Sequence, residues 1–284
     1  TNQLFINNEF IESQSKETMD VINPATGEAF DTITLATEEE VNDAIEKSQQ
    51  AQLEWERVPQ PTRAEHVKLL IPLLEKNRDE IAQLYVKEQG KTLSQAYGEI
   101  DKSISFIDYM TSLSMSDKGR VLQNSIANET IQIINKPIGV TAGIVPWNAP
   151  ILVLMRKVIP AIVTGCSVVI KPSEETTLLT LRLAELFRAS TIPAGLIQIV
   201  PGTGETVGTQ LASHKDIQLI SLTGSMRAGK SVYENAAQTV KKVNLELGGN
   251  APVIVTSNAD LDKAVDYIVT CLLYTSDAAD DSLR

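Results

Sequence analysis

The spacing of hydrophobic positions changes about halfway along the chain. From residue 139 onward, short β-branched runs alternate with longer apolar segments. The expected strands cover 140–145, 168–170, 196–200, 219–222, 243–245 and 253–255, and the expected helices cover 151–164, 176–190, 205–213 and 227–239. Strands and helices in alternation are typical of a parallel sheet with crossover helices. We therefore predict an α/β fold with a doubly wound parallel sheet of the Rossmann type.

The first part of the chain has a different pattern. The alternating segments 4–10 and 20–23, with a turn at 23–27, predict a hairpin at one edge of the fold. Thr37 and Glu40 match a capping box, after which apolar residues recur on one helical face. A hairpin followed by a helix is therefore expected at this end.

Four further elements complete the outline. Helices are predicted over 63–89, with a kink near Pro72, and over 93–113 and 260–269. Residues 129–136 alternate isoleucine with polar side chains, which indicates an exposed strand.

Composition excludes several classes of protein. Hydrophobic residues make up 43% of the chain and charged residues 21%, as in ordinary folded proteins. No apolar run approaches the roughly 20 residues of a membrane-spanning helix, and no secretion signal is recognisable, so we expect a cytoplasmic protein without a membrane partner. A net charge of −11 argues against a nucleic-acid partner. Cys166 and Cys271 are too few for a disulfide framework or a cysteine zinc site, and we expect no metal.

Two glycine-rich turns follow expected strands. One contains Gly204 and Gly208, and the other contains Gly224, Ser225 and Gly229. Such turns let the backbone approach a pyrophosphate, and the following helix offers unpaired N–H groups to the anion. Neither turn fits the G-x-G-x-x-G spacing, so a plain strand-to-helix connection is the alternative.

Polar residues end the expected strand 168–170. Lys171, Ser173 and Glu174 place a cation and an acid where ribose hydroxyls could bond to them. From these residues alone, a solvated loop in which Ser173 and Glu174 cap the next helix is the simpler interpretation.

Asn148 lies between two prolines, after Pro146 and Trp147 and before Pro150. A side-chain amide fixed by flanking prolines could donate to a developing oxyanion. Asparagine is also a common turn residue, which is the alternative.

Glu246 is framed by Leu245 and Leu247 at the end of an expected strand. A carboxylate in apolar surroundings can act as a general base near neutral pH. The alternative is a glutamate that points to solvent, and the flanking leucines favour the first interpretation.

Together these motifs resemble those of the aldehyde dehydrogenase superfamily, over residues 4–269. Five motifs share the family's order and approximate spacing, at 23–28, 146–148, 171–174, 222–225 and 245–249. The resemblance implies the family's fold and its reaction, in which a small aldehyde is oxidised to a carboxylic acid with NAD(P)+. That reaction proceeds through a cysteine thiohemiacetal, hydride transfer to the nicotinamide and hydrolysis of a thioester.

The resemblance also implies roles for individual residues. Asn148 would donate its amide to the aldehyde oxygen, and Glu246 would activate water for thioester hydrolysis. Lys171 and Glu174 would hold the adenine ribose, and Glu174 would repel a 2′-phosphate, which favours NAD over NADP. Ser225 would meet the pyrophosphate at a helix N-terminus. The other residues expected around the cofactor are Ile144, Pro146, Trp147, Ser173, Gly204, Gly208, Thr223, Gly224, Gly229 and Leu247.

One departure from the family concerns the nucleophile. The family's cysteine would fall within 276–280, where this sequence has none. Cys271 comes too early and lacks the motif's neighbours, and Cys166 precedes a buried strand, as a core thiol would. We expect residues 271–284 to be translated read-through or an assembly artefact joined to a truncated gene. The chain is then predicted to bind NAD without turnover, and a relative that passes its acyl group to coenzyme A is a further alternative.

The resemblance divides the chain into five parts. These are an N-terminal hairpin and helices at 1–127, a strand of the oligomerisation arm at 128–138, the NAD-binding core at 139–249, the start of a catalytic domain at 250–270 and the foreign tail at 271–284. The parent enzyme would be a homodimer or homotetramer. Residues 155–157 and 204–208 resemble bacterial enzymes that act on lactaldehyde or glycolaldehyde.

Overall fold

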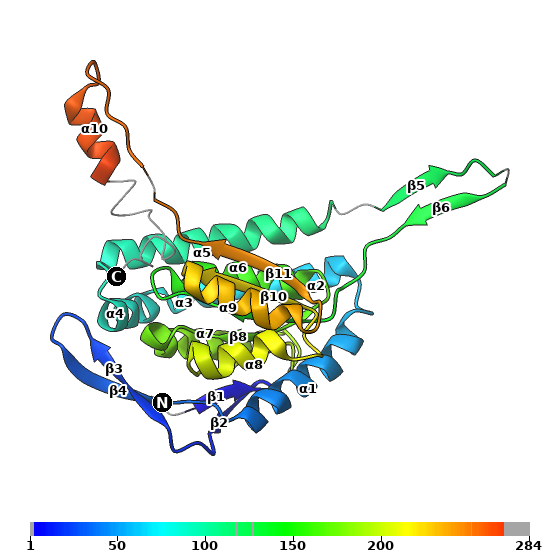
Figure 1. Cartoon of the computed structure of the whole chain (residues 1–284), viewed down its shortest axis with the longest axis horizontal. Coiled ribbons are helices and arrows are strands. Elements are labelled where there is room, and N and C mark those ends of the chain that lie inside the picture. The colour runs from blue at the N-terminus through cyan, green and yellow to red at the C-terminus, as the bar shows by residue number, and fades with distance from the viewer. Residues whose placement is uncertain (1–2, 117–118, 127, 251, 270–284) are drawn as a thin grey trace.

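A computed structural model describes residues 3–116, 119–126, 128–250 and 252–269 (Figure 1). Within these residues the main sheet has seven strands in the order β11-β10-β7-β8-β9-β1-β2. Its parallel part consists of β7 (Val140–Ile144), β8 (Ser167–Lys171), β9 (Ile197–Ile199), β10 (Leu219–Gly224) and β11 (Lys242–Leu247). The predicted α/β fold with a parallel core is confirmed.

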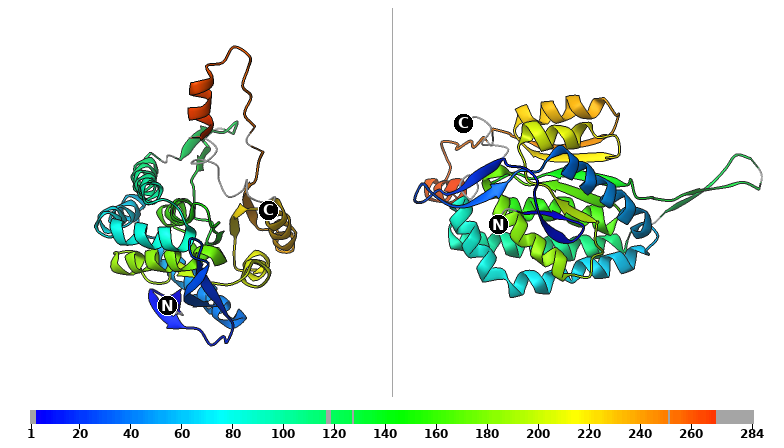
Figure 2. Two further views of the ribbon diagram at one scale, coloured as in Figure 1. Left: turned by 90° about the vertical axis from the view of Figure 1, so that its left-hand side faces the viewer. Right: turned by 90° about the horizontal axis from the view of Figure 1, so that it is seen from below.

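Helices cover both faces of this sheet (Figure 2). On one face, α1 (Glu38–Trp55), α8 (Thr209–Ser213) and α9 (Met226–Ala237) pack around Val41, Val169 and Val232. On the other face lie α6 (Pro150–Val163) and α7 (Thr177–Ala189), which follow β7 and β8. Because both faces are covered, every residue of β8 is buried, as expected for a central parallel strand.

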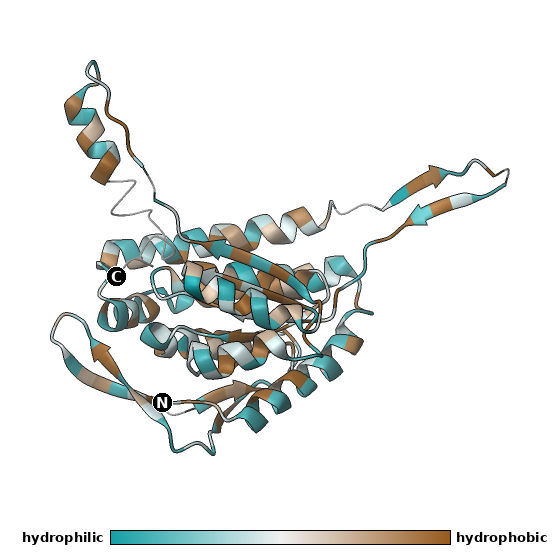
Figure 3. Ribbon diagram, viewed as in Figure 1, coloured by the Kyte–Doolittle hydropathy of each residue, from teal (hydrophilic) through white to brown (hydrophobic). Residues whose placement is uncertain are grey.

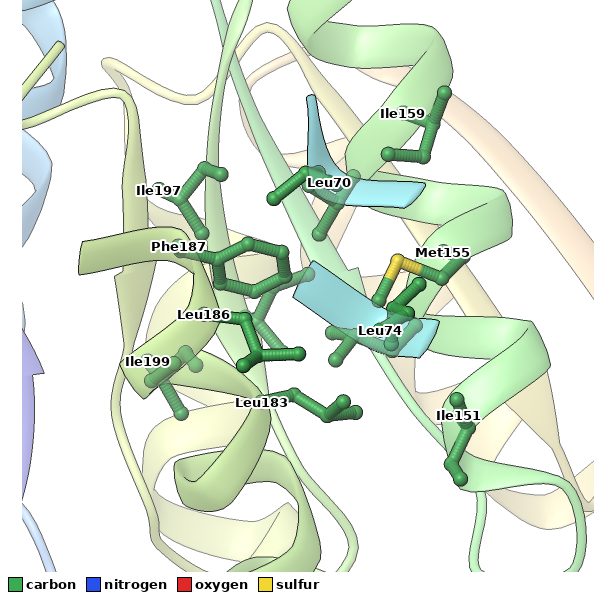
Figure 4. Packing of buried hydrophobic residues seen from close by; sticks show 14 of the residues in the cluster. Leu70, Leu74, Ile151, Met155, Ile159, Leu183, Leu186, Phe187, Ile197 and Ile199 are labelled. Atoms are coloured by element: carbon green, nitrogen blue, oxygen red, sulfur yellow. The ribbon is translucent and has the colours of Figure 1, made fainter. Parts of the chain in front are cut away.

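The larger hydrophobic core lies on the α6 and α7 side of the sheet (Figure 4). Burying one large aliphatic or aromatic side chain stabilises a fold by roughly 1.5–3 kcal/mol. This core anchors the two crossover helices that follow the Asn148 and Lys171 motifs. Its members include Leu70, Leu74, Ile151, Met155, Ile159, Leu183, Leu186, Phe187, Ile197 and Ile199.

The N-terminal hairpin differs from the prediction. Residues 4–10 do not form one strand, because the chain turns at Asn7 and Asn8, which have φ of 54° and 65°. β1 (Gln3–Ile6) and β2 (Glu9–Glu12) are therefore a hairpin of their own, joined to the main sheet through β9. Asparagine tolerates this left-handed conformation better than most residues. The segment predicted at 20–23 belongs to a second hairpin, β3 (Thr18–Asn23) with β4 (Glu28–Thr34).

The single helix predicted at 63–89 is wrong, because three helices occupy this region: α2 (Gln60–Lys68), α3 (Leu70–Lys76) and α4 (Arg78–Gln89). The first break falls at Leu69 rather than at Pro72. Proline has no N–H for the carbonyl four residues earlier, so α3 starts anew and places Pro72 in its first turn. The second break falls at Asn77, whose Nδ2 donates to the Leu73 carbonyl at 2.8 Å.

The other N-terminal helices agree with the sequence. The capping box of α1 is present, since Thr37 Oγ1 accepts from the Glu40 N–H and Glu40 accepts from the Thr37 N–H. α5 (Leu93–Ser114) matches the predicted 93–113 and begins with a second capping box, of Thr92 and Gln95.

Two parts of the chain extend away from the body in Figure 1. The exposed strand predicted at 129–136 is present as β6 (Thr130–Ile133), paired with β5 (Arg120–Gln123), which was not predicted. The predicted helix at 260–269 is α10 (Leu261–Ile268). The predicted strand at 253–255 is absent, because no described strand pairs with this exposed segment. Figure 3 shows apolar stretches on both extensions.

None of the described helices is long and apolar enough to cross a membrane. The predicted tail at 271–284, with Cys271, lies outside the described residues. The predicted division of the chain into five parts stays a prediction.

Candidate active site

The strand order creates a binding position at one edge of the sheet. Numbered along the chain, the parallel strands β7 to β11 lie in the order 3-2-1-4-5, so the direction of winding reverses between β7 and β10. Ligands of open α/β sheets bind outside the carboxyl ends of the strands at such a reversal. Two cavities lie there, lined by Ile144 at the end of β7 and by Leu222 and Thr223 near the end of β10.

The first cavity, which we call the α8–α9 cavity, has a volume of about 680 Å³. The helix predicted at 205–213 begins beside it as a single π-helical turn, Gly204–Gly208, which continues into α8. A Cβ placed on Gly204 would meet no atom within 4 Å, so bare backbone borders open space. The predicted cofactor residues that line this cavity are Ile144, Glu174, Gly204, Gly208 and Ser225.

Ser225 begins α9 at the edge of the α8–α9 cavity. Its Oγ accepts from the Ala228 N–H at 3.1 Å, which caps the helix, and Ala228 also lines the cavity. Unpaired N–H groups and a partial positive charge at a helix N-terminus favour anions. The first turn of α9 therefore suits the pyrophosphate contact predicted for Ser225.

Lys171, Glu174 and Gly204 form one polar cluster. Lys171 Nζ lies 3.2 Å from Glu174 Oε2, and Glu174 Oε1 accepts from the Gly204 N–H at 3.0 Å. Lys171 is 2% exposed, so a solvated loop is the wrong interpretation for it. Burial lowers the pKa of Lys171, and Glu174 opposes that shift. Ser173 does cap the next turn, since its Oγ accepts from the Glu175 N–H at 3.3 Å.

Several predicted cofactor residues line neither of the two cavities. Gly229 lies in α9 on the face that packs against β11, where a Cβ would lie 2.6 Å from Leu247 Cδ2. Its small size therefore lets α9 approach β11. Pro146 is buried and Trp147 is exposed in the connection from β7 to α6, and Gly224 ends β10.

The second cavity, which we call the α5–α6 cavity, has a volume of about 720 Å³. It brings together Asn148, Thr223 and Glu246, which are far apart in the sequence. Residues that the sequence did not single out for chemistry also line it. These include Lys91, Glu99, Lys102, Arg156, Lys157, Ser221 and Asn244.

Glu246 is not enclosed by its leucines. Side chains alternate along β11, so Leu245 and Leu247 pack against the α9 side of the sheet while Glu246 is exposed and faces the α5–α6 cavity. The prediction of apolar surroundings is therefore wrong. A place on a cavity wall that water can reach still suits a group that acts on water.

Asn148 is half-buried on the wall of the α5–α6 cavity. Its Oδ1 is buried and has no hydrogen-bond partner within the described residues. Its backbone carbonyl, in contrast, accepts from Lys91 Nζ at 2.8 Å and lies 3.0 Å from Tyr85 Oη. The backbone of Asn148 is thus fixed, while its side-chain oxygen has no partner in the part of the chain that the structure describes.

Lys157 is a buried cation of the same cavity, and the sequence singled it out only as part of 155–157, with no predicted place in the site. It is 9% exposed, and its Nζ donates to Ser221 Oγ at 2.9 Å and to Thr223 Oγ1 at 3.2 Å. Burial lowers its pKa to about 8, and the charge of Glu246 opposes that shift. Two adjacent cations, Arg156 and Lys157, within the otherwise apolar segment 150–163 were the available signal.

The groups around the α8–α9 cavity fit a dinucleotide. Glu174 offers acceptors for ribose hydroxyls, and the first turn of α9 offers donors for phosphate oxygens. Leu222, Ala212 and Val232 supply an apolar wall for a flat ring. The cavity therefore has the three kinds of surface that such a ligand needs.

Comparisons with known proteins bear on the family and the fold. The profile of the Aldehyde dehydrogenase family matches residues 10–277. The chain is 38% identical over 264 residues to the succinate-semialdehyde dehydrogenase [NADP(+)] of Escherichia coli, covering 93% of the chain and 55% of that protein. It resembles the crystal structure of E. coli lactaldehyde dehydrogenase with a TM-score of 0.93 and 36% identity, covering 96% of the chain and 57% of that one. The structure of Staphylococcus aureus betaine aldehyde dehydrogenase in complex with NAD+ gives a TM-score of 0.92 and 34% identity, covering 95% and 54%.

The chain spans about half the length of the relatives it matches. The matched part includes the five ordered motifs and both cavities. Since sequence, strand order and the matched relatives agree, the chain belongs to the aldehyde dehydrogenase family, whose members oxidise aldehydes to acids with NAD(P)+.

Proposed function

We propose that this chain provides the cofactor-binding half of an NAD-dependent enzyme that oxidises a small polar aldehyde to its carboxylic acid. One observation carries the proposal. Neighbouring residues of β10 line different cavities, with Leu222 on the α8–α9 side and Thr223 on the α5–α6 side. A dinucleotide in the first cavity would thus lie beside the cavity that holds Asn148 and Glu246.

Asn148 and Glu246 would carry separate steps. The Asn148 amide would donate a hydrogen bond to the aldehyde oxygen as negative charge develops there. Glu246 would take a proton from the water that hydrolyses the acyl intermediate. When bound, the nicotinamide cofactor accepts the hydride. Overall, one aldehyde, one water and one NAD+ give one carboxylate, one NADH and two protons.

No cysteine is among the described residues that line either cavity. Cys166 is 3% exposed and lines neither cavity. We therefore propose that the chain as printed binds NAD+ without turnover, and that the parent enzyme supplies the reactive thiol.

Glu174 supports NAD+ over NADP+. Its carboxylate faces the α8–α9 cavity with both oxygens held in place, one by Lys171 and one by the Gly204 N–H. A fixed negative charge there would accept hydrogen bonds from a ribose and would repel a 2′-phosphate.

A polar or anionic aldehyde fits the α5–α6 cavity best. Lys102 and Arg156 line it and make no ion pair within the described residues. A hydroxyl or carboxylate near the aldehyde group would meet donors there. Lactaldehyde, glycolaldehyde and semialdehydes are the substrates to test first. A cytoplasmic location and a homodimeric or homotetrameric parent belong to the same proposal.

Two measurements on the printed chain test the proposal. Calorimetry should detect NAD+ binding, and an absorbance assay with lactaldehyde should detect no NADH. Failure to bind NAD+ would contradict the cofactor assignment. Turnover that disappears in Cys271→Ser would contradict the interpretation of residues 271–284, because Cys271 would then be the nucleophile.

A further inference from the structure

A polar cluster lies directly behind Asn148, where α4, α5 and the start of α6 meet. Tyr85 Oη is 2.6 Å from Glu99 Oε2, and Lys91 Nζ is 3.0 Å from the same oxygen and 2.9 Å from Tyr85 Oη. Tyr85 is fully buried, and the Glu99 and Lys91 side chains are 6% and 20% exposed. We call these three residues the Lys91 clamp.

The available protons show how the clamp holds Asn148. A tyrosine hydroxyl donates one proton, and the shorter contact, to Glu99, takes it. An ammonium group donates three, and Lys91 Nζ has three acceptors: Glu99 Oε2, Tyr85 Oη and the Asn148 carbonyl at 2.8 Å. Lys91 is therefore the donor that fixes the Asn148 carbonyl, and it has no proton left for a substrate.

The same clamp fixes the other side of the motif. Glu99 Oε1 accepts from the Ile151 N–H at 3.0 Å and from the Leu152 N–H at 3.1 Å. Both donors lie in the first turn of α6, which has no side-chain cap of its own. N–H groups in a first helical turn need partners from outside the helix. Glu99 thus holds the helix that begins just after Asn148.

We infer that Lys91, with Glu99 and Tyr85, positions Asn148 for the oxyanion contact. This inference rests on the role proposed above for Asn148. Because the buried Asn148 Oδ1 has no partner among the described residues, the direction of the amide depends on the backbone, and the clamp fixes that backbone. A displacement of about 1 Å in a reacting group lowers rates by about 100-fold, so such fixation matters.

The test follows the Asn148 side-chain amide directly in the full printed chain. Selective ¹⁵N-asparagine labelling gives its NH₂ signal, which is one pair of proton cross-peaks on a shared ¹⁵N shift, and Asn148→Asp identifies that pair by its absence. In Lys91→Met we expect this signal to shift and split, because the carbonyl has lost its donor. Lys91→Arg keeps a cation with several donors and should restore a single signal. In Glu99→Gln, exchange of the Ile151 and Leu152 amides should become about tenfold faster.

Lys68→Met is the matched control. It removes a lysine–carboxylate pair of the same kind, with Asp108 at 3.0 Å, from an exposed position away from the motif, and should leave the signal unchanged. If Lys91→Met does not fold, Tyr85→Phe removes one oxygen of the clamp and should still shift the signal. An unchanged Asn148 signal in a folded Lys91→Met or Tyr85→Phe chain would overturn the inference.

Calorimetry with NAD+ separates this inference from the proposed function. The clamp does not line the α8–α9 cavity, so the dissociation constant for NAD+ should stay within about twofold in Lys91→Met. An unmodified chain that fails to bind NAD+ would contradict the proposed function, while the amide signals would still test the clamp.

Discussion

Two buried glutamates hold the two crossover helices of the site in the same way, but in different surroundings. Glu99 accepts from the first N–H groups of α6, and Glu88 accepts from the Leu178 and Leu179 N–H groups of α7 at 2.7 and 2.8 Å. Glu99 is paired with Lys91. Among the described residues, no cation pairs with Glu88, and the charges that affect it, Asp31 and Glu175, are negative.

The two caps share their geometry and differ in the charges around them. Burial raises the pKa of Glu88 to about 8, although its two backbone hydrogen bonds oppose that shift. The helix after the Asn148 motif is thus held by a carboxylate with a cation beside it. The helix after the Lys171 motif is held by an acid that can gain a proton near neutral pH.

The largest expected effect is on the unfolding free energy, when the same substitution is made at Glu99 and at Glu88. Glu99→Gln leaves Lys91 facing an amide instead of a carboxylate, and breaking a buried ion pair costs about 3 kcal/mol or more. Glu88→Gln removes no pairing with a cation and replaces an acid whose protonated form folding favours, so it should cost at most about 1 kcal/mol at any pH. Urea unfolding of both variants measures this order. A greater loss of unfolding free energy in Glu88→Gln would refute the contrast between the caps.

The pH dependence of stability sharpens the comparison. In the folded chain the pKa of Glu88 is raised from 4.5 to about 8, so folding favours its protonated form. Its contribution is full below about pH 4.5 and is lost as the pH rises through about 8. The unfolding free energy should therefore fall relative to Glu88→Gln by at most about 1.4 kcal/mol per pH unit in that window. Parallel urea series at several pH values test this, and equal slopes for the two chains would speak against a titrating Glu88.

A smaller effect, on cofactor binding, is expected at Glu174 of the Lys171 motif, which precedes α7 and lines the α8–α9 cavity. Glu174→Gln keeps an oxygen for the Gly204 N–H but removes the charge beside Lys171. We expect NAD+ to bind about five- to tenfold more weakly, since a hydrogen bond to a charged acceptor becomes a neutral one. NADP+ should bind more tightly than before. Calorimetry with both cofactors decides, and weakened binding of both would argue against charge repulsion as the cause of the preference.

The smallest effect is expected on the stability of α9, which is capped by its own N-terminal residue, Ser225, rather than by a distant glutamate. Ser225→Ala removes the acceptor of the Ala228 N–H and should cost about 1 kcal/mol of unfolding free energy. Ser225→Asn retains a capping oxygen and serves as the control. If both variants unfold at the same urea concentration, the Ser225 side chain does not stabilise this helix.

Local pattern was sufficient for much of the fold. The alternation of strands and helices after residue 139 predicted the parallel sheet, because a strand covered on both faces reads as a short apolar run. The capping box of Thr37 and Glu40 predicted the start of α1. The order of the motifs predicted that Asn148 and Glu246 belong to one site. The structure brings both to the α5–α6 cavity although they lie 98 residues apart in the sequence (148 and 246).

What the sequence did not reveal depends on distant partners. In the sequence, Glu88 and Glu99 look like ordinary acidic residues of a helix. The N–H groups that donate to their carboxylates lie 90 and 52 residues further along the chain. The burial of Lys157 depends on the hydroxyls of Ser221 and Thr223 on β10, which accept hydrogen bonds from its ammonium group. The strand expected at 253–255 failed for a related reason, since strand propensity requires a neighbouring strand to pair with.

The alternation along β10 has a consequence for how such a protein can vary. Ser221 and Thr223 face the α5–α6 cavity and Leu222 faces the α8–α9 cavity, so residues that are adjacent in the sequence line different cavities, here called compartments. A substitution at Leu222 alters one compartment and leaves the other intact. Deletion of a single residue would exchange every side chain beyond it between the two. Point mutation can therefore tune the two compartments independently, whereas a length change within this strand would damage both at once.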